Sequence, residues 1–200
     1  MKYVITAIML GGLLFTSGCA FSDVKLDVEY DKNLAKAGPL ASVNSLKVNV
    51  SEFTDKRLLP DRVGDVRNGY GAHTADIITN KPVVDVVRNA IADTFEINGH
   101  VVTDVNPDIV ISGDIERFWF ESQANFWTIE FMGTIDVNLS VSDAASNNTI
   151  FSKRYSGHNN EEMYVGYDKE MHRVLNAALD DLMFKIGMDS QLADALKSAD

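Results

Sequence analysis

The feature that most limits how this chain can fold is a long alternation of apolar and polar side chains. From Trp127 to Val141 the odd-numbered positions are apolar or glycine, and the positions between them, from Thr128 to Ser140, are mostly polar. Successive side chains of a β-strand point to opposite faces, so a period of two indicates a strand with one buried face. The pattern predicts one long strand in a mainly antiparallel sheet.

The other elements follow from the same kind of reading. We predict, in chain order, a strand at 45–53, a helix opened by Pro82 and closed by Gly99, strands at 100–103, 109–120 and 150–155, and a helix capped by Asp168. Ser190 is expected to cap a short terminal helix. This order predicts an α+β fold with two main helices packed on one face of the sheet.

A long polar segment over residues 54–80 shows no clear periodicity, apart from short strands predicted around Val63 and at 74–78. Loops of this length are uncommon unless they are functional or mobile. The segment mixes both signs of charge, and two interpretations stay open: a lattice of Asp–Arg pairs that orders the loop, or contact with a partner. The residues concerned are Asp55, Arg57, Arg62 and Arg67, with Lys56, Asp61 and Asp65 between them.

The first 19 residues have the organisation of an export signal. A basic residue precedes an apolar stretch at 4–15, which is too short to cross a bilayer, since a spanning helix takes about 20 residues. The last four residues, Thr-Ser-Gly-Cys, resemble the bacterial lipobox, although Thr16 stands where leucine is usual. The resemblance implies cleavage before Cys19 and acylation of that cysteine. The alternative is an ordinary secretory signal cut near Gly18 or Ala20.

Cys19 is the only cysteine, which excludes an intramolecular disulfide, a thiolate metal site and a cysteine nucleophile in the mature domain. Acyl chains on Cys19 would attach the protein to a membrane. By resemblance to enterobacterial lipoprotein sorting, Ala20 after the cysteine favours the outer membrane, with the domain facing the periplasm.

The chain is therefore expected to have three parts: a signal peptide (1–18), a lipidated N-terminus and tether (19–45), and a single α+β domain (46–200). The residues from Val24 to Tyr30 alternate in polarity, which predicts one short strand in the tether that could pair with the edge of the domain.

The charge of the chain argues against nucleic acid as a partner. The 18 basic and 29 acidic residues give −11, and removal of the signal with its single Lys2 makes the balance −12. Nucleic-acid binding requires clusters of Lys and Arg that release counterions, and no such run exists. An acidic surface is also repelled by anionic lipid headgroups.

No catalytic constellation is recognisable, and we expect neither an enzyme nor a bound cofactor or metal. The four histidines are widely spaced and are expected at the surface or in turns. The glycines at 69 and 71 lack the strand and helix that flank a phosphate-binding loop. Asp114 and Glu116 share a strand face, but we expect them to be solvated rather than to act as an acid–base pair.

An aromatic cluster surrounds the turn predicted at 121–125, and it is the first candidate interaction site. Phe118 and Phe120, like Phe126, have the parity opposite to the apolar stripe, so some rings are expected to project from the hairpin. Exposed aromatic rings mark a ligand groove, a protein interface or a membrane contact. The alternative is that the first helix or the N-terminal strand covers them. The cluster comprises Phe118, Trp119, Phe120, Phe126 and Trp127.

Several short segments resemble YajG-like envelope lipoproteins over most of residues 46–186. They are Leu-Lys-Val-Asn-Val at 46–50, Asp-Lys-Arg at 55–57, Phe-Glu-Ile-Asn-Gly-His-Val-Val at 95–102 and Pro-Asp-Ile-Val-Ile-Ser-Gly at 107–113. The resemblance implies an outer-membrane-anchored periplasmic domain and brings no catalytic residues.

We therefore expect a non-catalytic binding or structural role in the cell envelope, with another envelope protein or a second copy of the chain as partner. The alternative is a lipid-handling accessory lipoprotein of an envelope transport system, with the aromatic cluster as its apolar groove.

Overall fold

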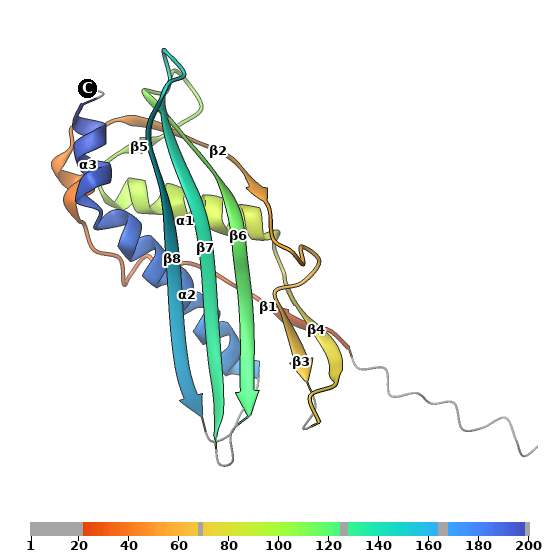
Figure 1. The fold of residues 1–200 in the computed structure, drawn as a ribbon. Coiled ribbons are helices and arrows are strands. Elements are labelled where there is room, and N and C mark those ends of the chain that lie inside the picture. Colours follow the sequence, from red (N-terminus) through yellow and green to blue (C-terminus); the bar gives the residue numbers. More distant parts are fainter. Residues whose placement is uncertain (1–21, 68–69, 125–127, 164–167, 199–200) are drawn as a thin grey trace, which may run out of the picture.

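Three long antiparallel strands form the centre of the computed structural model, which describes residues 22–67, 70–124, 128–163 and 168–198. β6 (Ile109–Ala124), β7 (Ile129–Asp143) and β8 (Thr149–Met163) pair along almost their whole length (Figure 1). The long predicted strand is confirmed as β7, and the α+β class is confirmed with it. The odd-numbered apolar side chains of β7 are buried in the core, namely Phe131, Ile135, Val137, Leu139 and Val141.

The alternation of β6 changes in the middle of the strand. Ile115 and Arg117 pair with consecutive residues of β7, so Glu116 between them is the extra residue of a β-bulge. Beyond the bulge the even-numbered side chains face the core, and Phe118 and Phe120 are 1% and 0% exposed. The expectation that some rings project therefore does not hold for Phe118 and Phe120, because the parity of the apolar stripe does not carry across a bulge.

Five short strands extend the sheet beyond β6 and make it mixed. β2 runs parallel to the first half of β6, with β5 outside it, whereas β3 meets the second half of β6 and is followed outward by β4 and β1. The strands predicted inside the polar segment are confirmed as β3 and β4. In chain order the five are β1 (Val24–Leu26), β2 (Lys47–Asp55), β3 (Gly64–Arg67), β4 (His73–Thr79) and β5 (Val101–Val102).

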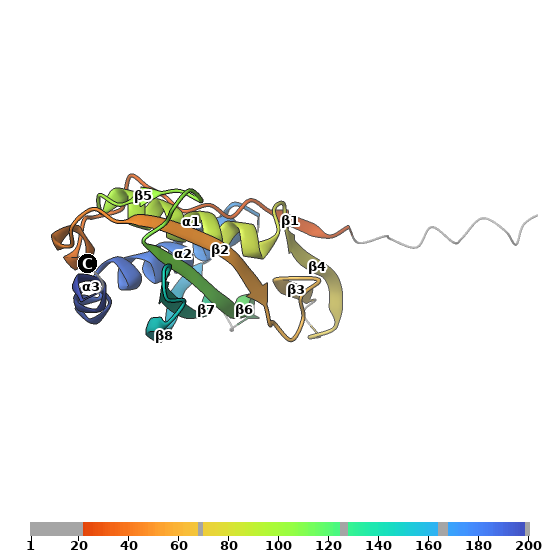
Figure 2. The same cartoon turned by 90° about the horizontal axis from the view of Figure 1, so that it is seen from above.

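Two helices cover one face of the sheet, as predicted (Figure 2). α1 (Val83–Ile97) packs on β2, and α2 (Asp168–Gly187) packs on β7 and β8. A short helix, α3 (Ser190–Lys197), follows and contacts the 3₁₀ turn η1 (Pro39–Ser42). Asp189, not Ser190, caps α3, because its carboxylate accepts hydrogen bonds from the first N–H groups of the helix. None of the helices in the described ranges combines the length and the apolar character that a membrane span requires.

Two glycines let α2 approach the sheet closely. Gly133 lies on β7 and Gly157 on β8, both beneath the helix. A Cβ at position 157 would lie 2.2 Å from the carbonyl oxygen of Ala178 and 2.7 Å from Cβ of Leu182. The backbone of α2 therefore rests directly on the strand.

Residues 24–43, which the sequence assigned to a tether, belong to the folded domain, and we call them the N-terminal strap. The strap begins in β1 beside β4 and continues along α1 and α2 (Figure 1). Its side chains Leu26, Val28, Leu40 and Val43 are 0% to 7% exposed and join the main core. The domain thus begins well before the expected boundary at residue 46. Cys19 and the signal segment lie outside the described residues.

Candidate binding site

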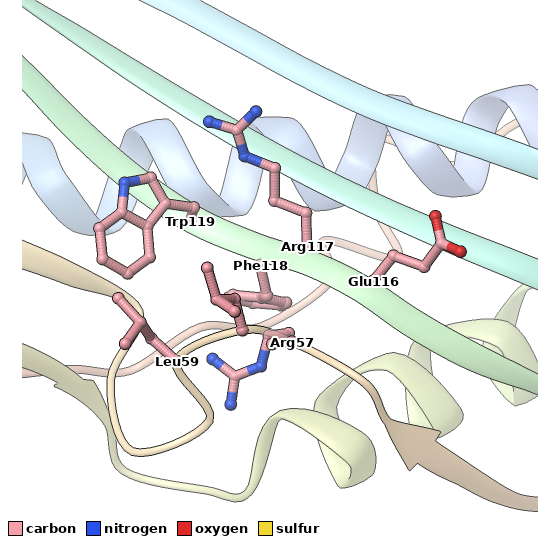
Figure 3. Close-up of a pocket in the computed structure, with 7 residues that line it drawn as sticks. Arg57, Leu59, Glu116, Arg117, Phe118 and Trp119 are labelled. Carbon is pink, nitrogen blue, oxygen red and sulfur yellow. The ribbon is translucent and has the colours of Figure 1, made fainter.

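A cavity of about 290 Å³ lies where β6 changes neighbours. β2 pairs with β6 as far as Ile115, β3 meets β6 at Phe120, and the loop from β2 to β3 crosses the interval. Figure 3 shows Leu59 of the loop close to Trp119 and Phe118 of the strand, so the walls are largely apolar. The lining residues are Arg57, Leu58, Leu59, Glu116, Arg117, Phe118 and Trp119.

Arg57 fixes the loop from the inside. Its side chain is 6% exposed, and its guanidinium donates two hydrogen bonds to Asp55, at 2.9 and 2.8 Å. It also donates to the carbonyl oxygens of Pro60 and Arg62, each at 2.8 Å. Burial alone would raise the pKa of Asp55, but the hydrogen bonds and the charge of Arg57 lower that pKa below its ordinary value. Arg57 is therefore a positioning residue that shapes one wall of the cavity.

A second charged cluster holds the far end of the loop to the β3–β4 hairpin. Arg62 lies 3.0 Å from Asp65 and 2.9 Å from Asp76, and Arg67 lies 2.9 Å from the other oxygen of Asp65. His73 contacts Asp76 at 2.9 Å, and its hydrogen bond is the largest of the effects that lower the pKa of Asp76.

Part of this cluster has the donor types of a metal site. One ligand atom from each of Asp65, His73 and Asp76 can be chosen so that all three lie within 4.8 Å of one another. Arg62, however, places its guanidinium against both carboxylates. A metal ion bound there would meet a fixed positive charge at short range, which favours an ion-pair cluster over a metal centre.

The four loop residues singled out in the sequence fall into these two clusters. Asp55 and Arg57 lie at the start of the loop, and Arg62 and Arg67 lie at its end. Their contacts are those of the ordering lattice, so the loop is held in place by its own charges. The part of the loop between the two clusters, which contains Leu58 and Leu59, faces the solvent.

That stretch carries the most exposed apolar surface next to the cavity. Leu58 is 94% exposed and Leu59 is 37% exposed, although the hydrophobic effect favours burial of both. Arg117 stands exposed at the rim and has no ion-pair partner among the residues that the structure describes. An apolar hollow beside an exposed arginine has the composition of a protein-binding patch.

The structure separates the five aromatic residues of the predicted cluster. Trp119 lines the cavity and is partly exposed, Phe118 forms its buried floor, and Phe120 lies in the core against Phe131. Phe126 and Trp127 lie outside the described residues. Sequence reasoning missed the two leucines, although an apolar pair inside a polar segment without periodicity was a usable signal.

The remaining polar candidates have structural partners. His100 is 5% exposed rather than at the surface as expected, because it packs against Phe95 and its Nδ1 accepts a hydrogen bond from the N–H of Leu46. Asp114 pairs with a lysine of the loop at 2.6 Å. Glu116 accepts a hydrogen bond from Asn138 at 2.6 Å and pairs with an arginine of β8 at 3.2 Å. The two carboxylates of β6 are thus held by separate partners.

The model of a family described as uncharacterized lipoprotein matches residues 36–197, which is most of the chain. The chain belongs to this lipoprotein family. The lipoprotein is thereby placed among the membrane-anchored proteins of the bacterial envelope. The matched region starts inside the N-terminal strap, in agreement with a domain that begins before residue 46. No curated protein matches the sequence significantly.

Solved structures resemble the chain at low sequence identity. Protein XCC0632 of Xanthomonas campestris, a member of the family DUF330, matches with a TM-score of 0.55 at 14% identity, over 90% of this chain and 96% of the other. A minor lipoprotein of Acinetobacter baumannii matches with a TM-score of 0.46 at 12% identity, over 76% of this chain and 93% of the other. The first likeness shows the fold of the lipoprotein.

Proposed function

We propose that this lipoprotein is a non-catalytic, YajG-like protein of the outer membrane, anchored through Cys19 with its domain in the periplasm, and that it binds another envelope protein. The cavity bordered by Leu58, Leu59 and Trp119 is the binding site. The observation that carries the proposal is the exposure of Leu58 on a loop that two ion-pair clusters hold in place. A loop that ion pairs fix at both ends, with Leu58 turned outward, is a preformed surface.

The size of the cavity favours a protein side chain over a lipid. Pockets for small ligands typically measure 300–1,000 Å³, and this cavity of about 290 Å³ lies just below that range. It has room for one apolar or aromatic side chain, which is the usual anchor of a protein interface. The lipid-handling alternative would need a groove that continues past Trp119.

Charge narrows the class of partner. The mature chain has a net charge near −12, so it repels most acidic surfaces at long range. At the rim of the cavity, by contrast, the exposed charge of Arg117 has no described counterion. A carboxylate beside the inserted side chain would pair with Arg117 and set the orientation of the partner. We propose a partner segment that combines an apolar anchor with an acidic residue.

Site-specific crosslinking tests the binding site. A photoreactive phenylalanine derivative replaces Leu58 in the full-length, membrane-anchored protein, and a matched variant carries it at Val105, which is 70% exposed in another loop. We expect one protein adduct from position 58 that is absent from position 105 and is reduced at least tenfold by Trp119→Ala.

The other outcomes are equally specific. An adduct of twice the monomer mass would identify a second copy of the chain as the partner. A phospholipid adduct would replace the proposal with the lipid-handling alternative. Adducts that are the same at both positions would refute the binding site.

A further inference from the structure

The N-terminal strap is held along α2 by a regular set of hydrogen bonds. Alternate backbone N–H groups of the extended strap donate to side chains one helical turn apart. Two extended residues cover about 6.7 Å and four helical residues about 6.0 Å, so the two periods match closely. The bonds run from Asp27 to Nδ1 of His172 (3.0 Å), from Glu29 to Oδ1 of Asn176 (3.2 Å) and from Asp31 to Oδ1 of Asp180 (3.0 Å).

Other contacts close the strap against the rest of the domain. β1 pairs with β4, and ahead of it Asp23 accepts a hydrogen bond from the N–H of Asp76 at 3.4 Å. Lys32 pairs with Asp93 of α1 at 2.6 Å. Release of the strap would also expose its buried apolar side chains to water, which is unfavourable. The chain is therefore fixed to the domain from the start of β1 onward.

This arrangement leaves a very short link between lipid and domain. Cys19 and Val24 are five residues apart, and a fully extended chain of that length spans at most about 18 Å. Had residues 19–45 been a free tether, the same limit would have been about 90 Å. Because the strap is part of the domain, the greatest possible distance between Cys19 and the domain is much shorter than the sequence suggested.

The binding cavity lies close to the attachment point. Val24 pairs with Ile77, Ile77 with Gly64, and Gly64 with Phe120, so these four residues form one row across four strands. Neighbouring strands are about 4.8 Å apart, so the row covers about 14 Å. Trp119 adjoins Phe120, and the cavity is therefore within about 35 Å of Cys19, which is less than the roughly 40–45 Å thickness of a whole bilayer.

We propose that the strap keeps the cavity at the surface of the membrane that carries the anchor, and that its occupant is a surface-exposed segment of an integral protein of that membrane. This inference rests on acylation of Cys19 and on the binding site proposed above. The cavity stays within about 35 Å of the anchor, which is where surface segments of integral proteins of the same membrane lie, and the acidic chain itself gains no attraction from anionic headgroups. The partner with an acidic and apolar segment is therefore sought in the same membrane.

Fluorescence energy transfer from the labelled protein to the membrane tests how close the cavity lies to the lipid headgroups. The full-length acylated protein is placed in phosphatidylcholine vesicles that carry an acceptor dye on the headgroups. Since acylation blocks Cys19, the variants Leu58→Cys and Val105→Cys each present a single reactive thiol. Position 105 precedes the start of β6, more than about 30 Å along the strand from Phe120. We expect stronger transfer from position 58 than from position 105.

A lengthened link provides the control. Twenty Gly and Ser residues inserted between Ser22 and Asp23 leave every described element intact and roughly double the root-mean-square length of the link. We expect transfer from position 58 to fall and the difference between the two positions to shrink. Equal transfer from both positions, or transfer that the insertion does not change, would overturn the inference about reach.

The identity of the crosslinked partner tests the second part of the inference, which is that the occupant belongs to an integral protein of the same membrane. An integral membrane protein in the adduct from position 58 supports the inference. A soluble periplasmic protein or a component of the opposite membrane would overturn it while leaving the binding site intact. Absence of an adduct specific to position 58 would instead refute the proposed function, so the two failures are distinguishable.

Discussion

Replacement of Gly157 by alanine tests how α2 is seated on the sheet. The added methyl group would lie 2.2 Å from the carbonyl oxygen of Ala178, more than 1 Å short of the 3.4 Å at which ordinary contact begins. Because the obstructing atoms include helix backbone, no side-chain rotation relieves the clash, and α2 must move away from β8. Overpacking of this kind costs about 1–3 kcal/mol, and we expect a value near 3 kcal/mol.

For a domain of this size, 1 kcal/mol changes Tm by about 2–4 °C, so Gly157→Ala should lower Tm by about 6–12 °C. Thermal unfolding followed by circular dichroism measures the change. Gly187→Ala is the matched control, because its methyl group would meet atoms only at 3.6 and 3.7 Å. A helical alanine is also favoured over glycine by about 0.5–1 kcal/mol, so the control should unfold at the same temperature or higher. Equal Tm values for wild type and Gly157→Ala would refute the close seating of α2.

Three further predictions concern buried side chains, namely those of Phe118, Arg57 and Asp189. Phe118→Ala should lower the free energy of unfolding by about 3–5 kcal/mol in urea titrations, whereas Trp119→Ala at the partly exposed wall of the cavity should lower it far less. Equal losses would contradict the conclusion that the bulge turns Phe118 into the core. Arg57→Lys should cost about 2–3 kcal/mol, because lysine cannot reproduce the paired and carbonyl-directed hydrogen bonds; an unchanged urea midpoint would exclude that role. Burial opposes the charge of Asp189, but hydrogen bonds, the largest from Lys153, outweigh it and lower its pKa below 3.8. The carboxylate therefore stabilises the fold above pH 3.8 and loses this effect as pH falls through the lowered pKa, so the deficit of Asp189→Asn, about 1–3 kcal/mol at neutral pH, should shrink in acid; a deficit independent of pH would disprove the linkage.

The main strands and helices could be predicted because their apolar residues recur with a regular period along the sequence. The alternation from 127 to 141 identifies β7 because each side chain alone reports which face it occupies. In α2 the apolar residues at helical spacing are all buried, namely Met171, Leu175, Ala178, Leu182 and Ile186. Such patterns suffice for the elements that build the core, since they depend only on neighbours within one strand or helix.

The errors arose where the structure depends on distant contacts. The presence of Glu116 in the sequence does not indicate a β-bulge. The bulge nevertheless determines that Phe118 and Phe120 face the core. The strap contains a Gly-Pro break and follows directly on the signal segment, where a linker is expected, yet Leu26 and Val28 are buried by elements far along the chain. For the candidate site, Trp119 was among the predicted residues, whereas Leu58 and Leu59 were missed, because the contacts of Arg57 that fix their loop cannot be read from the sequence.

The hydrogen bonds between strap and α2 join residues 145 to 149 positions apart in the chain. Contacts of such high order close late, because most of the chain must be in place before they form. The N-terminal residues are made first, but their docking site on α2 is made nearly last. Until α2 is made, Asp27, Glu29 and Asp31 lack the side chains that accept hydrogen bonds from their N–H groups. The helix α2, although it lies near the C-terminal end of the chain, thus completes the site that fixes the first residues of the domain.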